Sequence, residues 1–459
     1  MCLKTNLISS HRYPNFLSIL TIFTATNQNM EKKKFLFVSY DALISDIAWQ
    51  VVKEGHDAKY YIREEDSADC ADGFVPKIKD WQKEIDWADI IVFDDVLGMG
   101  AWSEDLKNKG KVVVGGSRYT DKLEDDRTFG QEELKKYGVN IIPFQEFTSF
   151  DDAIRFVQSN PSRYVIKPSG EAQNYKRLLF VGEEEDGKDV VQMLEAYKKT
   201  VADKVKIFQL QKRVTGVEVA VGAFFNGNKF MTPINVNFEH KKLFPGNIGP
   251  ATGEMGTTMY WSEPNKLFAA TLQKMETKLR EEKYTGYMDV NCIVNSQGIY
   301  PLEFTARFGY PTISIQQEGI NIPFSEFLYG MADGTLNEFK TKKGFQLGVR
   351  ICMPPFPFND DQTYNTHTKD SVIMFKKKNF EGIHIEDVKL VNGEWMVAGS
   401  SGVIMIVVGT GSTMKQAKAQ AYSRVANVMI PGMYYRDDIG ERWIEDSDRL
   451  HSWGYLRGV

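Results

Sequence analysis

A carboxylate, a hydroxyl and a guanidinium recur at every second position in one run of the chain, at Glu303, Thr305 and Arg307. Alternate residues of a β-strand point to the same face, so we expect these three side chains to share one face. Asp289 and Asn291 alternate in the same way upstream, and the intervening Asn-Ser-Gln-Gly is typical of a tight hairpin turn. Antiparallel pairing would bring this upstream pair close to Glu303 and Thr305. Such hard oxygen ligands beside an arginine suit Mg²⁺ and a nucleoside triphosphate, because Mg²⁺ takes few protein carboxylates and fills its other positions with phosphate oxygens and water.

An ordinary half-exposed hairpin with a polar outer face would show the same alternation. The composition sets only loose bounds on the choice. A chain of 459 residues is too long for one core and predicts two to three domains. With 42% hydrophobic and 25% charged residues it is typical of a globular protein, and its net charge of −5 gives no sign of a nucleic-acid surface. The four cysteines have no metal-ligand spacing and no disulfide pattern, so we expect a reducing, cytoplasmic location.

The first 29 residues contain a short apolar run, 15–23, that is too short to span a bilayer. No small-x-small cleavage site follows it, and Met30 precedes a lysine-rich start just before a strand. We therefore interpret residues 1–29 as a dispensable extension and expect no transmembrane segment and no membrane partner.

Strand and helix patterns alternate from residue 34 onwards. Strands are predicted at 35–39, 89–93 and 111–115, with helices at 44–54 and 104–109 between them. This order favours a parallel α/β unit, in which ligands bind beyond the carboxyl ends of the strands. No Gly-x-Gly-x-x-Gly follows the first strand, so we expect no dinucleotide site.

Lys167 ends an apolar strand, 164–167, and is followed by a polar, glycine-containing loop at 168–176. A lysine and a loop of backbone N–H donors suit a phosphate cradle. Taken alone, a solvent-facing lysine before a turn would look the same.

A second loop, 238–256, carries four glycines within its last eleven residues, among basic and polar groups. Such a segment cannot build a core and suits a mobile loop that approaches a ligand closely. A structural omega loop is the alternative.

Three blocks in this order carry a resemblance that runs from about Lys34 to Trp443. The segments 239–242 (Glu-His-Lys-Lys) and 249–256 (Gly-Pro-Ala-Thr-Gly-Glu-Met-Gly) resemble the Asp-His-Lys-Arg and Gly-Pro-Asn-Thr-Gly-Gly-Met-Gly of phosphoribosylamine-glycine ligases, which are members of the ATP-grasp superfamily. The segments 303–309 and 435–440 resemble that family's Glu-Phe-Asn-x-Arg-Phe-Gly and Tyr-Arg-x-Asp-Ile-Gly. The resemblance implies a mixed α/β and α+β fold with an N-terminal parallel α/β domain, an ATP-grasp domain and a small β-rich C-terminal domain.

The resemblance also implies nucleotide contacts at matching positions. Arg127, where the family usually has lysine, and Lys167 would meet the ATP phosphates, while Glu218 would hold the ribose hydroxyls. The adenine-contacting segment would lie at Gln211, Lys212 and Val214.

Metal and catalytic roles follow from the same resemblance. Glu303 would bridge Mg²⁺ or Mn²⁺ ions, and Arg307 would neutralise charge on the transferring phosphoryl group. The neighbouring metal ligands would be Asn291, Thr305 and Asp289. The other candidate catalytic residues are His240 and Lys241.

The implied reaction is ATP-dependent C–N ligation. A carboxylate, glycine in the family, attacks the γ-phosphate of ATP to give an acyl phosphate and ADP. An amine, 5-phosphoribosylamine in the family, then displaces phosphate and forms glycinamide ribonucleotide, a step of de novo purine biosynthesis. The loops 168–176 and 239–256 would close over the acyl phosphate and exclude water. We expect small-molecule partners and a monomer or homodimer.

Several positions depart from the family pattern. The Gly-Gly-Arg-Glu-His-Ala that holds the phosphoribosyl substrate is replaced by 40–45 (Tyr-Asp-Ala-Leu-Ile-Ser), the later Gly-Pro-Glu by 93–95 (Phe-Asp-Asp), and the C-terminal Gly-Gly-Arg by 400–402 (Ser-Ser-Gly). Acidic residues in place of backbone donors and an arginine would repel a sugar phosphate. Thr305 also replaces an asparagine, and a hydroxyl is a weaker ligand, for which Asp289 is expected to compensate by adding charge.

The C-terminal part is predicted to be β-rich, with a helix at 413–427 whose apolar positions are core. We expect the domains 30–120, 121–345 with a nucleotide lid at about 140–215, and 346–459. His240 is the one histidine that we assign to a site. Four others are expected at the surface: His56, His367, His384 and His451.

Two hypotheses remain open. The first is an active ligase, with glycine and 5-phosphoribosylamine or with a different carboxylate and amine. The second is a nucleotide-binding regulator that has lost catalysis. Retention of Lys167, Glu218, Glu303 and Arg307 favours the enzyme, because a pure binder needs no magnesium carboxylate together with an arginine.

Overall fold

The protein is described by a computed structural model that covers residues 31–96, 98–169, 172 and 178–456. The chain divides into two units, Met1–Lys32 and Lys33–Val459, and the fold below belongs to the second. The extension predicted at 1–29 lies outside the described residues.

The N-terminal strands form the parallel sheet that the sequence predicts. They are β1 (Lys34–Ser39), β2 (Asp57–Ile62), β3 (Ile90–Phe93) and β4 (Val113–Val114), paired in the order β2, β1, β3, β4. Helices α1 (Ser45–Lys53) and α2 (Gly100–Asn108) follow β1 and β3. All residues of β3 are buried, as a strand covered on both faces requires.

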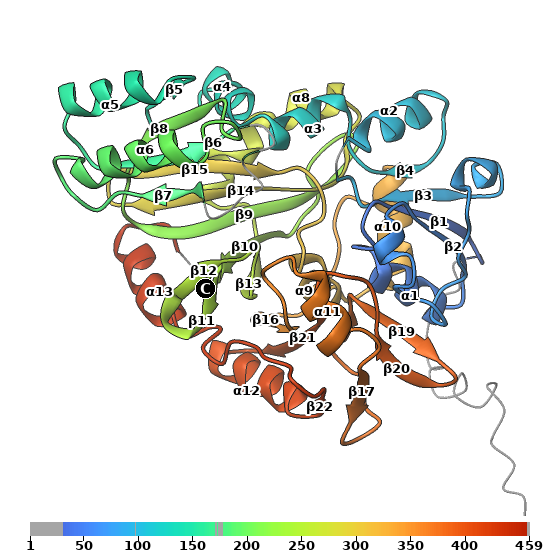
Figure 1. Ribbon diagram of the computed structural model, residues 1–459. Helices are drawn as coiled ribbons and strands as arrows, with labels where there is room; N and C mark the ends of the chain where they lie inside the picture. Colours follow the sequence, from blue (N-terminus) through green and yellow to red (C-terminus); the bar gives the residue numbers. More distant parts are fainter. Residues whose placement is uncertain (1–30, 97, 170–171, 173–177, 457–459) are drawn as a thin grey trace, which may run out of the picture. The chain divides into compact units, whose positions relative to one another are not determined.

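A large antiparallel sheet carries most of the remaining strands in the order β15, β14, β9, β10, β13, β16, β21, β18 (Figure 1). These strands are β9 (Val217–Asn226), β10 (Ile234–Glu239), β13 (Gly256–Ser262), β14 (Thr285–Asn295), β15 (Gly298–Thr305), β16 (Phe345–Cys352), β18 (Ile383–Ile385) and β21 (Val403–Gly411). Because β16 pairs with β13, the sheet continues across the boundary predicted at 345/346, and the domain boundaries stay a prediction.

A smaller sheet has the order β5, β8, β6, β7 and is packed against two helices (Figure 1). Its elements are β5 (Phe144–Phe147), β6 (Tyr164–Pro168), β7 (Phe180–Val181), β8 (Phe208–Lys212), α5 (Phe150–Ser159) and α6 (Lys188–Thr200). The segment 238–256, expected as a loop, instead contains a hairpin of β11 (Lys242–Phe244) and β12 (Ile248–Ala251). Gly246 and Gly249 adopt positive φ there, which explains the glycines without an irregular loop.

The C-terminal part is β-rich, as predicted. Strands β19 (Val388–Val391), β20 (Glu394–Val397), β17 (Val372–Phe375) and β22 (Val428–Met429) pair in that order. Helix α12 (Met414–Val425) packs on β21 and β16, and its buried positions Met414, Ala417, Ala421 and Val425 are those predicted as core. Trp49 of α1 meets Phe74 and Trp395 of β20 with ring centroids 4.8 and 5.6 Å away, which joins the first and last parts of the unit.

The other helices cover the sheets or connect them. They are α3 (Arg118–Asp125), α4 (Arg127–Lys136), α7 (Lys266–Ala270), α8 (Glu276–Glu281), α9 (Thr312–Gly319), α10 (Phe324–Ala332), α11 (Asp361–His367) and α13 (Trp443–Ser452). Within the described ranges, every helix is too short or too polar to cross a membrane.

His384 is not the surface group that the sequence suggested. It is buried on β18, where its Nδ1 lies 2.7 Å from Asp46 of α1 and its Nε2 lies 3.6 Å from Glu318 of α9. Burial lowers its pKa, but the two carboxylates more than offset this and raise the pKa to about 9. The imidazolium therefore joins three distant segments as a buried ion pair.

We predict that His384→Asn lowers the free energy of unfolding by about 3 to 5 kcal/mol, because it leaves the buried Asp46 carboxylate without its cation. The folded pKa of about 9 lies above the ordinary 6.5, so the stabilisation is complete below pH 6.5 and is lost as pH rises through 9. Urea unfolding of the wild type and the variant between about pH 6 and pH 10 measures both effects. The exposed His367→Asn serves as the control. Equal pH dependence in wild type and His384→Asn would contradict the assignment.

Candidate active site

The hairpin of β14 and β15 brings together the residues predicted to lie close, with a bulge between Asn291 and Cys292 that the sequence did not predict. Asp289 faces Thr305 and Asn291 faces Glu303 across the antiparallel pair. Strand β14 also pairs with β9, so that it lies between two strands that carry polar side chains. One expectation was wrong: β15 ends at Thr305, and Arg307 lies beyond the strand instead of on its face.

Lys241 lies among three carboxylates from three strands. Its Nζ is 2.8 Å from Glu218 of β9, 3.3 Å from Glu239 of β10 and 3.8 Å from Glu303 of β15. Asn291 adds a hydrogen bond of 3.0 Å from its amide to Glu218. The β14–β9–β10 order of the sheet brings these residues together, although they lie up to 85 positions apart in the sequence.

The charges in this cluster depend on one another. Burial alone would lower the pKa of Lys241, but Glu218, Glu239 and Glu303 hold it well above the ordinary value. Burial would raise the pKa of Glu218, and Lys241 with Asn291 lowers it below the ordinary value. The pKa of Glu239 is raised by burial and by its two carboxylate neighbours. Lys241 and Glu218 therefore form a charged pair. The negative charge of Glu239 is offset less, because burial and its carboxylate neighbours outweigh Lys241.

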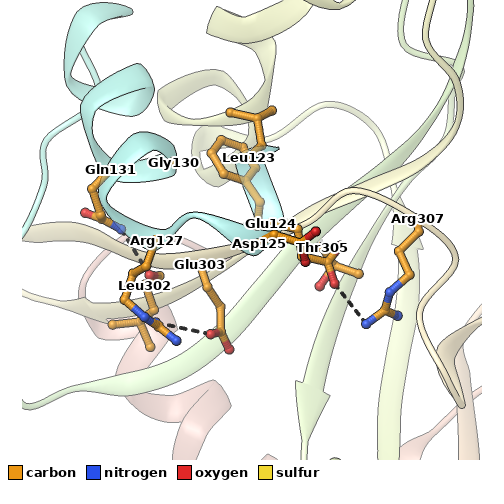
Figure 2. Close-up of a pocket in the computed structure, with 11 residues that line it drawn as sticks. Leu123, Glu124, Asp125, Arg127, Gly130, Gln131, Leu302, Glu303, Thr305 and Arg307 are labelled. Carbon is orange, nitrogen blue, oxygen red and sulfur yellow. Dashed lines mark hydrogen bonds and ion pairs between the residues drawn. The ribbon is translucent and has the colours of Figure 1, made fainter. Parts of the chain in front are cut away.

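A second cationic group lies on the other side of Glu303. Arg127, the first residue of α4, has its guanidinium 3.4 Å from the Glu303 carboxylate, as Figure 2 shows. Lys167 of β6 is buried, and burial together with the nearby Arg127 cation lowers its pKa to about 7. A buried lysine beside an arginine, with little negative charge to pair with, is suited to a phosphate anion.

Arg127 and Glu303 border a cleft of about 220 Å³ that α3, α4 and β15 enclose. Arg127, Glu303, Thr305 and Arg307 line it, and Figure 2 shows the two arginines at opposite sides. Glu124, the residue before the last in α3, holds the Arg307 end: one carboxylate oxygen lies 3.0 Å from the Arg307 guanidinium. The other oxygen accepts a 2.8 Å hydrogen bond from the Ala306 N–H.

Oxygen donors suited to a hard cation lie next to this cleft. Oδ1 of Asp289 and Oδ1 of Asn291 are buried and have no hydrogen-bond partner among the described residues. Burial raises the pKa of Asp289 to about 8, so a cation nearby would restore its charge. In the described ranges no three His, Cys, Asp or Glu side chains are grouped as a metal site. The unpartnered oxygens of Asp289 and Asn291 are hard donors that fit Mg²⁺, which takes most of its other ligands from phosphate and water.

Four of the predicted site residues lie apart from this cluster. His240 is buried, neither ring nitrogen has a hydrogen-bond partner in the described part of the chain, and burial lowers its pKa to about 3. The ring is therefore neutral, and its charged neighbours are Arg442, Arg436 and Asp438 instead of the carboxylate cluster. The remaining three lie on or just after β8 of the small sheet: Gln211, Lys212 and Val214.

The sequence analysis missed three acidic residues of the site. Glu239 and Glu254 lie inside the motif segments quoted above, where they replace an aspartate and a glycine of the family. These two replacements could have marked them as site residues. Glu254 is buried with Oε1 unpartnered among the described residues, and burial raises its pKa well above the ordinary value. Apart from an acidic run before α4, nothing in the sequence marks Glu124 as a site residue, because its partner Arg307 is 183 positions away.

Comparison with known proteins matches two family models to this chain. The ATP-grasp (A) domain of phosphoribosylglycinamide synthetase matches residues 125–313, and the C domain of the same enzyme matches residues 363–442. The first range contains the carboxylate cluster, both arginines and all of the residues that line the cleft except Leu123 and Glu124.

Curated relatives agree with these models. A phosphoribosylamine–glycine ligase of Streptococcus pneumoniae is 26% identical over 364 residues, which is 77% of this chain and 83% of the relative. That of Halalkalibacterium halodurans is 24% identical over 74% of this chain and 79% of the relative.

Solved structures share the fold. The phosphoribosylamine–glycine ligase of Thermotoga maritima has a TM-score of 0.66 at 20% identity and covers 88% of this chain and 99% of its own. The biotin carboxylase domain of the Hydrogenobacter thermophilus 2-oxoglutarate carboxylase has a TM-score of 0.60 at 13% identity, covering 93% and 100%. The order of segments, the cleft and both family models agree, and the chain belongs to the phosphoribosylglycinamide synthetase family of ATP-grasp ligases.

Proposed function

We propose that this protein joins a carboxylate to an amine in an ATP-dependent reaction that passes through an acyl phosphate. The observation that carries the proposal is the position of Glu303, which is 3.4 Å from Arg127, 3.8 Å from Lys241 and in the same cleft as Arg307. A protein that only binds nucleotide does not need a metal-binding carboxylate that lies between Arg127 and Lys241 and shares a cleft with Arg307.

The proposed chemistry has two balanced steps. In the first, a carboxylate oxygen attacks the γ-phosphorus of ATP, the bond to the β-phosphate oxygen breaks, and ADP leaves. In the second, the amine nitrogen attacks the acyl carbon, the bond to the phosphate oxygen breaks, and the proton lost by nitrogen leaves with phosphate. Arg307 and Arg127 would offset the negative charge of the transferring group from opposite sides of the cleft.

Mg²⁺ would be held by Glu303, Asn291 and Thr305, with Asp289 beside them, and would offset phosphate charge when bound. Glu218 would accept the ribose hydroxyls, and Lys241 would keep that carboxylate ionised. The adenine would contact β8 near Gln211, Lys212 and Val214, which lie in the part of the chain that resembles the adenine-contacting segment.

The relatives are named for glycine and phosphoribosylamine, which form the first pair to test. A direct assay is phosphate release from Mg·ATP by the full chain with glycine, the amine, both, or neither. Release that needs a carboxylate and an amine together supports the ligase. Nucleotide binding without release for any pair would favour the regulator instead.

We predict that ADP binding at about pH 8 without Mg²⁺ draws a proton from the buffer, because Lys167 with its pKa near 7 becomes charged beside phosphate. Isothermal titration in two buffers of different ionisation enthalpy measures this uptake. Lys167→Met should abolish the uptake and weaken ADP binding at least tenfold, whereas the exposed Lys204→Met should change neither. Unaltered uptake in Lys167→Met would remove this lysine from the phosphate site.

Glu303→Gln is expected to lower Mg·ATP turnover at least a hundredfold, because it removes the carboxylate that would bind Mg²⁺. The side chain is 44% exposed, so the melting temperature should stay close to that of the wild type. Glu132→Gln, an exposed position on α4, is the matched control. A folded Glu303→Gln with wild-type turnover would take Glu303 out of the mechanism.

Glu124→Gln should lower kcat roughly 10- to 100-fold with little change in the KM for ATP, because Glu124 positions Arg307 without lining the nucleotide end of the cleft. The amide retains one hydrogen bond and loses the charge that holds the guanidinium. Steady-state phosphate release gives both constants, with the exposed Glu281→Gln as control. If KM alone rose, Glu124 would act in binding and not in positioning Arg307.

A further inference from the structure

In two loops that the sequence marks as departures from the family, hydrogen-bond donors are paired with carboxylates of the protein itself. The first follows β1 and β3, at the carboxyl edge of the parallel sheet. The Tyr40 N–H donates a 2.8 Å hydrogen bond to Asp94, and the Ser39 hydroxyl donates to the same carboxylate oxygen. A backbone N–H and a hydroxyl at the end of a strand, just before a helix, are the donors that would hold an anion. Here an internal carboxylate already occupies them.

The second loop shows the same arrangement in the C-terminal part. Ser401 donates to Asp387 with its backbone N–H at 2.9 Å and with its hydroxyl at 2.8 Å. The Gly399 N–H donates to Asp69 at 2.8 Å. The donors of this loop are therefore also paired with carboxylates of the protein itself.

The two loops lie against each other. Cys70, which follows β2, packs with Ala42 of the first loop and Ala398 beside the second, and its thiol is 3.7 Å from Asp387. Together they form one region from two parts of the chain.

This region adjoins the phosphoryl end of the proposed active site. The Tyr310 hydroxyl donates a 3.2 Å hydrogen bond to the Asp94 carbonyl, and the Arg307 guanidinium lies 5.4 Å from the Tyr310 ring. A substrate beyond the carboxyl ends of β1 and β3 would therefore reach toward Arg307.

Buried acceptors in the first loop are left over. Asp94 is fully buried and Asp95 is 9% exposed, and Oδ1 of each has no hydrogen-bond partner among the described residues. Burial raises the pKa of Asp94 to about 6 and that of Asp387 to about 7. A ligand that donates hydrogen bonds or carries positive charge would favour their ionised forms, and an anion would oppose them.

The cations nearby include Lys107, whose charge acts on Asp95, Lys389, which lies 2.9 Å from Asp69, and Arg63, whose surroundings are acidic. Arg63, at the end of β2, has its guanidinium 5.1 Å from the Tyr40 ring. Three acidic residues follow it directly: Glu64, Glu65 and Asp66. The edge as a whole therefore carries more negative than positive charge.

We infer that the amine substrate of this protein carries no phosphate and instead presents hydrogen-bond donors, hydroxyls or a second ammonium, to Asp94 and Asp95. The inference rests on the proposed ligase function and specifies the amine subsite of that same site. The inferred amine differs from the phosphoribosylamine named for the relatives. A sugar phosphate would meet buried carboxylates where it needs free N–H donors.

The test compares two amines that differ only in the phosphate. Ribosylamine and 5-phosphoribosylamine are generated from ribose or ribose 5-phosphate with ammonia, and phosphate release from Mg·ATP is followed with glycine present. Ethanolamine, 1,3-diaminopropane and ammonia alone complete the panel. We expect an unphosphorylated amine to give a kcat/KM at least tenfold above that of 5-phosphoribosylamine. A preference for 5-phosphoribosylamine would overturn the inference and leave the ligase standing.

Binding provides a second measurement that needs no turnover. In titrations of the ADP-loaded full chain, we expect no measurable affinity for ribose 5-phosphate in the wild type. A gain of at least tenfold is expected in Asp94→Gly, which frees both donors, and in Asp94→Asn, which keeps the shape and removes the charge. Asp89→Asn, at the opposite end of β3, is the matched control.

The outcomes separate the two proposals. Wild-type binding of ribose 5-phosphate stronger than about millimolar, or no gain in either Asp94 variant, would overturn the inference. Absence of both ADP binding and phosphate release with every amine would instead defeat the ligase itself.

Discussion

The ammonium of Lys241 is the charge on which the candidate site depends. Three carboxylates from β9, β10 and β15 converge within 3.8 Å of it, and removed from water they would repel one another. Lys241 offsets this repulsion, and Arg127 adds a second cation 3.4 Å from Glu303. Lys241 is therefore part of what holds the Glu303 carboxylate at the cleft, where a metal and a nucleotide would bind.

A second consequence of this arrangement is that charge is divided between the two ends of the cleft. Toward the nucleotide, burial and the neighbouring Arg127 cation lower the pKa of Lys167 to about 7. Toward the amine, burial raises the pKa of Asp94 to about 6. Each end is therefore suited to a ligand of the opposite charge: phosphates at one and donors at the other.

The register of Asp289 with Thr305 depends on a bulge between Asn291 and Cys292, which local patterns in the sequence did not indicate. Those patterns were sufficient to predict the hairpin itself, from alternation along β14 and β15 and a two-residue turn. The same holds for α12, whose buried positions repeat at helical spacing. Arg307 was placed wrongly because the alternation continues one step beyond the point where β15 ends.

Contacts between distant segments could not be predicted in this way. His384 and Asp46 lie 338 positions apart, and nothing in the residues around His384 indicates a buried partner. Glu124 was missed for the same reason, since its role arises only when α3 is packed against the end of β15. The carboxylate cluster was found in part because its members lie in motif segments, whereas the order of strands that joins them is a property of the whole sheet.

The internal carboxylates also bear on how such a family changes substrate. An aspartate that accepts from Tyr40 and Ser39 stabilises its loop in the free protein, whereas a loop that holds an anionic substrate must leave those donors unsatisfied until the substrate binds. The aspartate therefore fills the anion-binding position, and it also removes the cost of leaving those donors unsatisfied in the free protein. Because Asp387 does the same for Ser401, both loops favour the same loss of phosphate recognition. The nucleotide end is built from other strands, so this change leaves the ATP chemistry untouched.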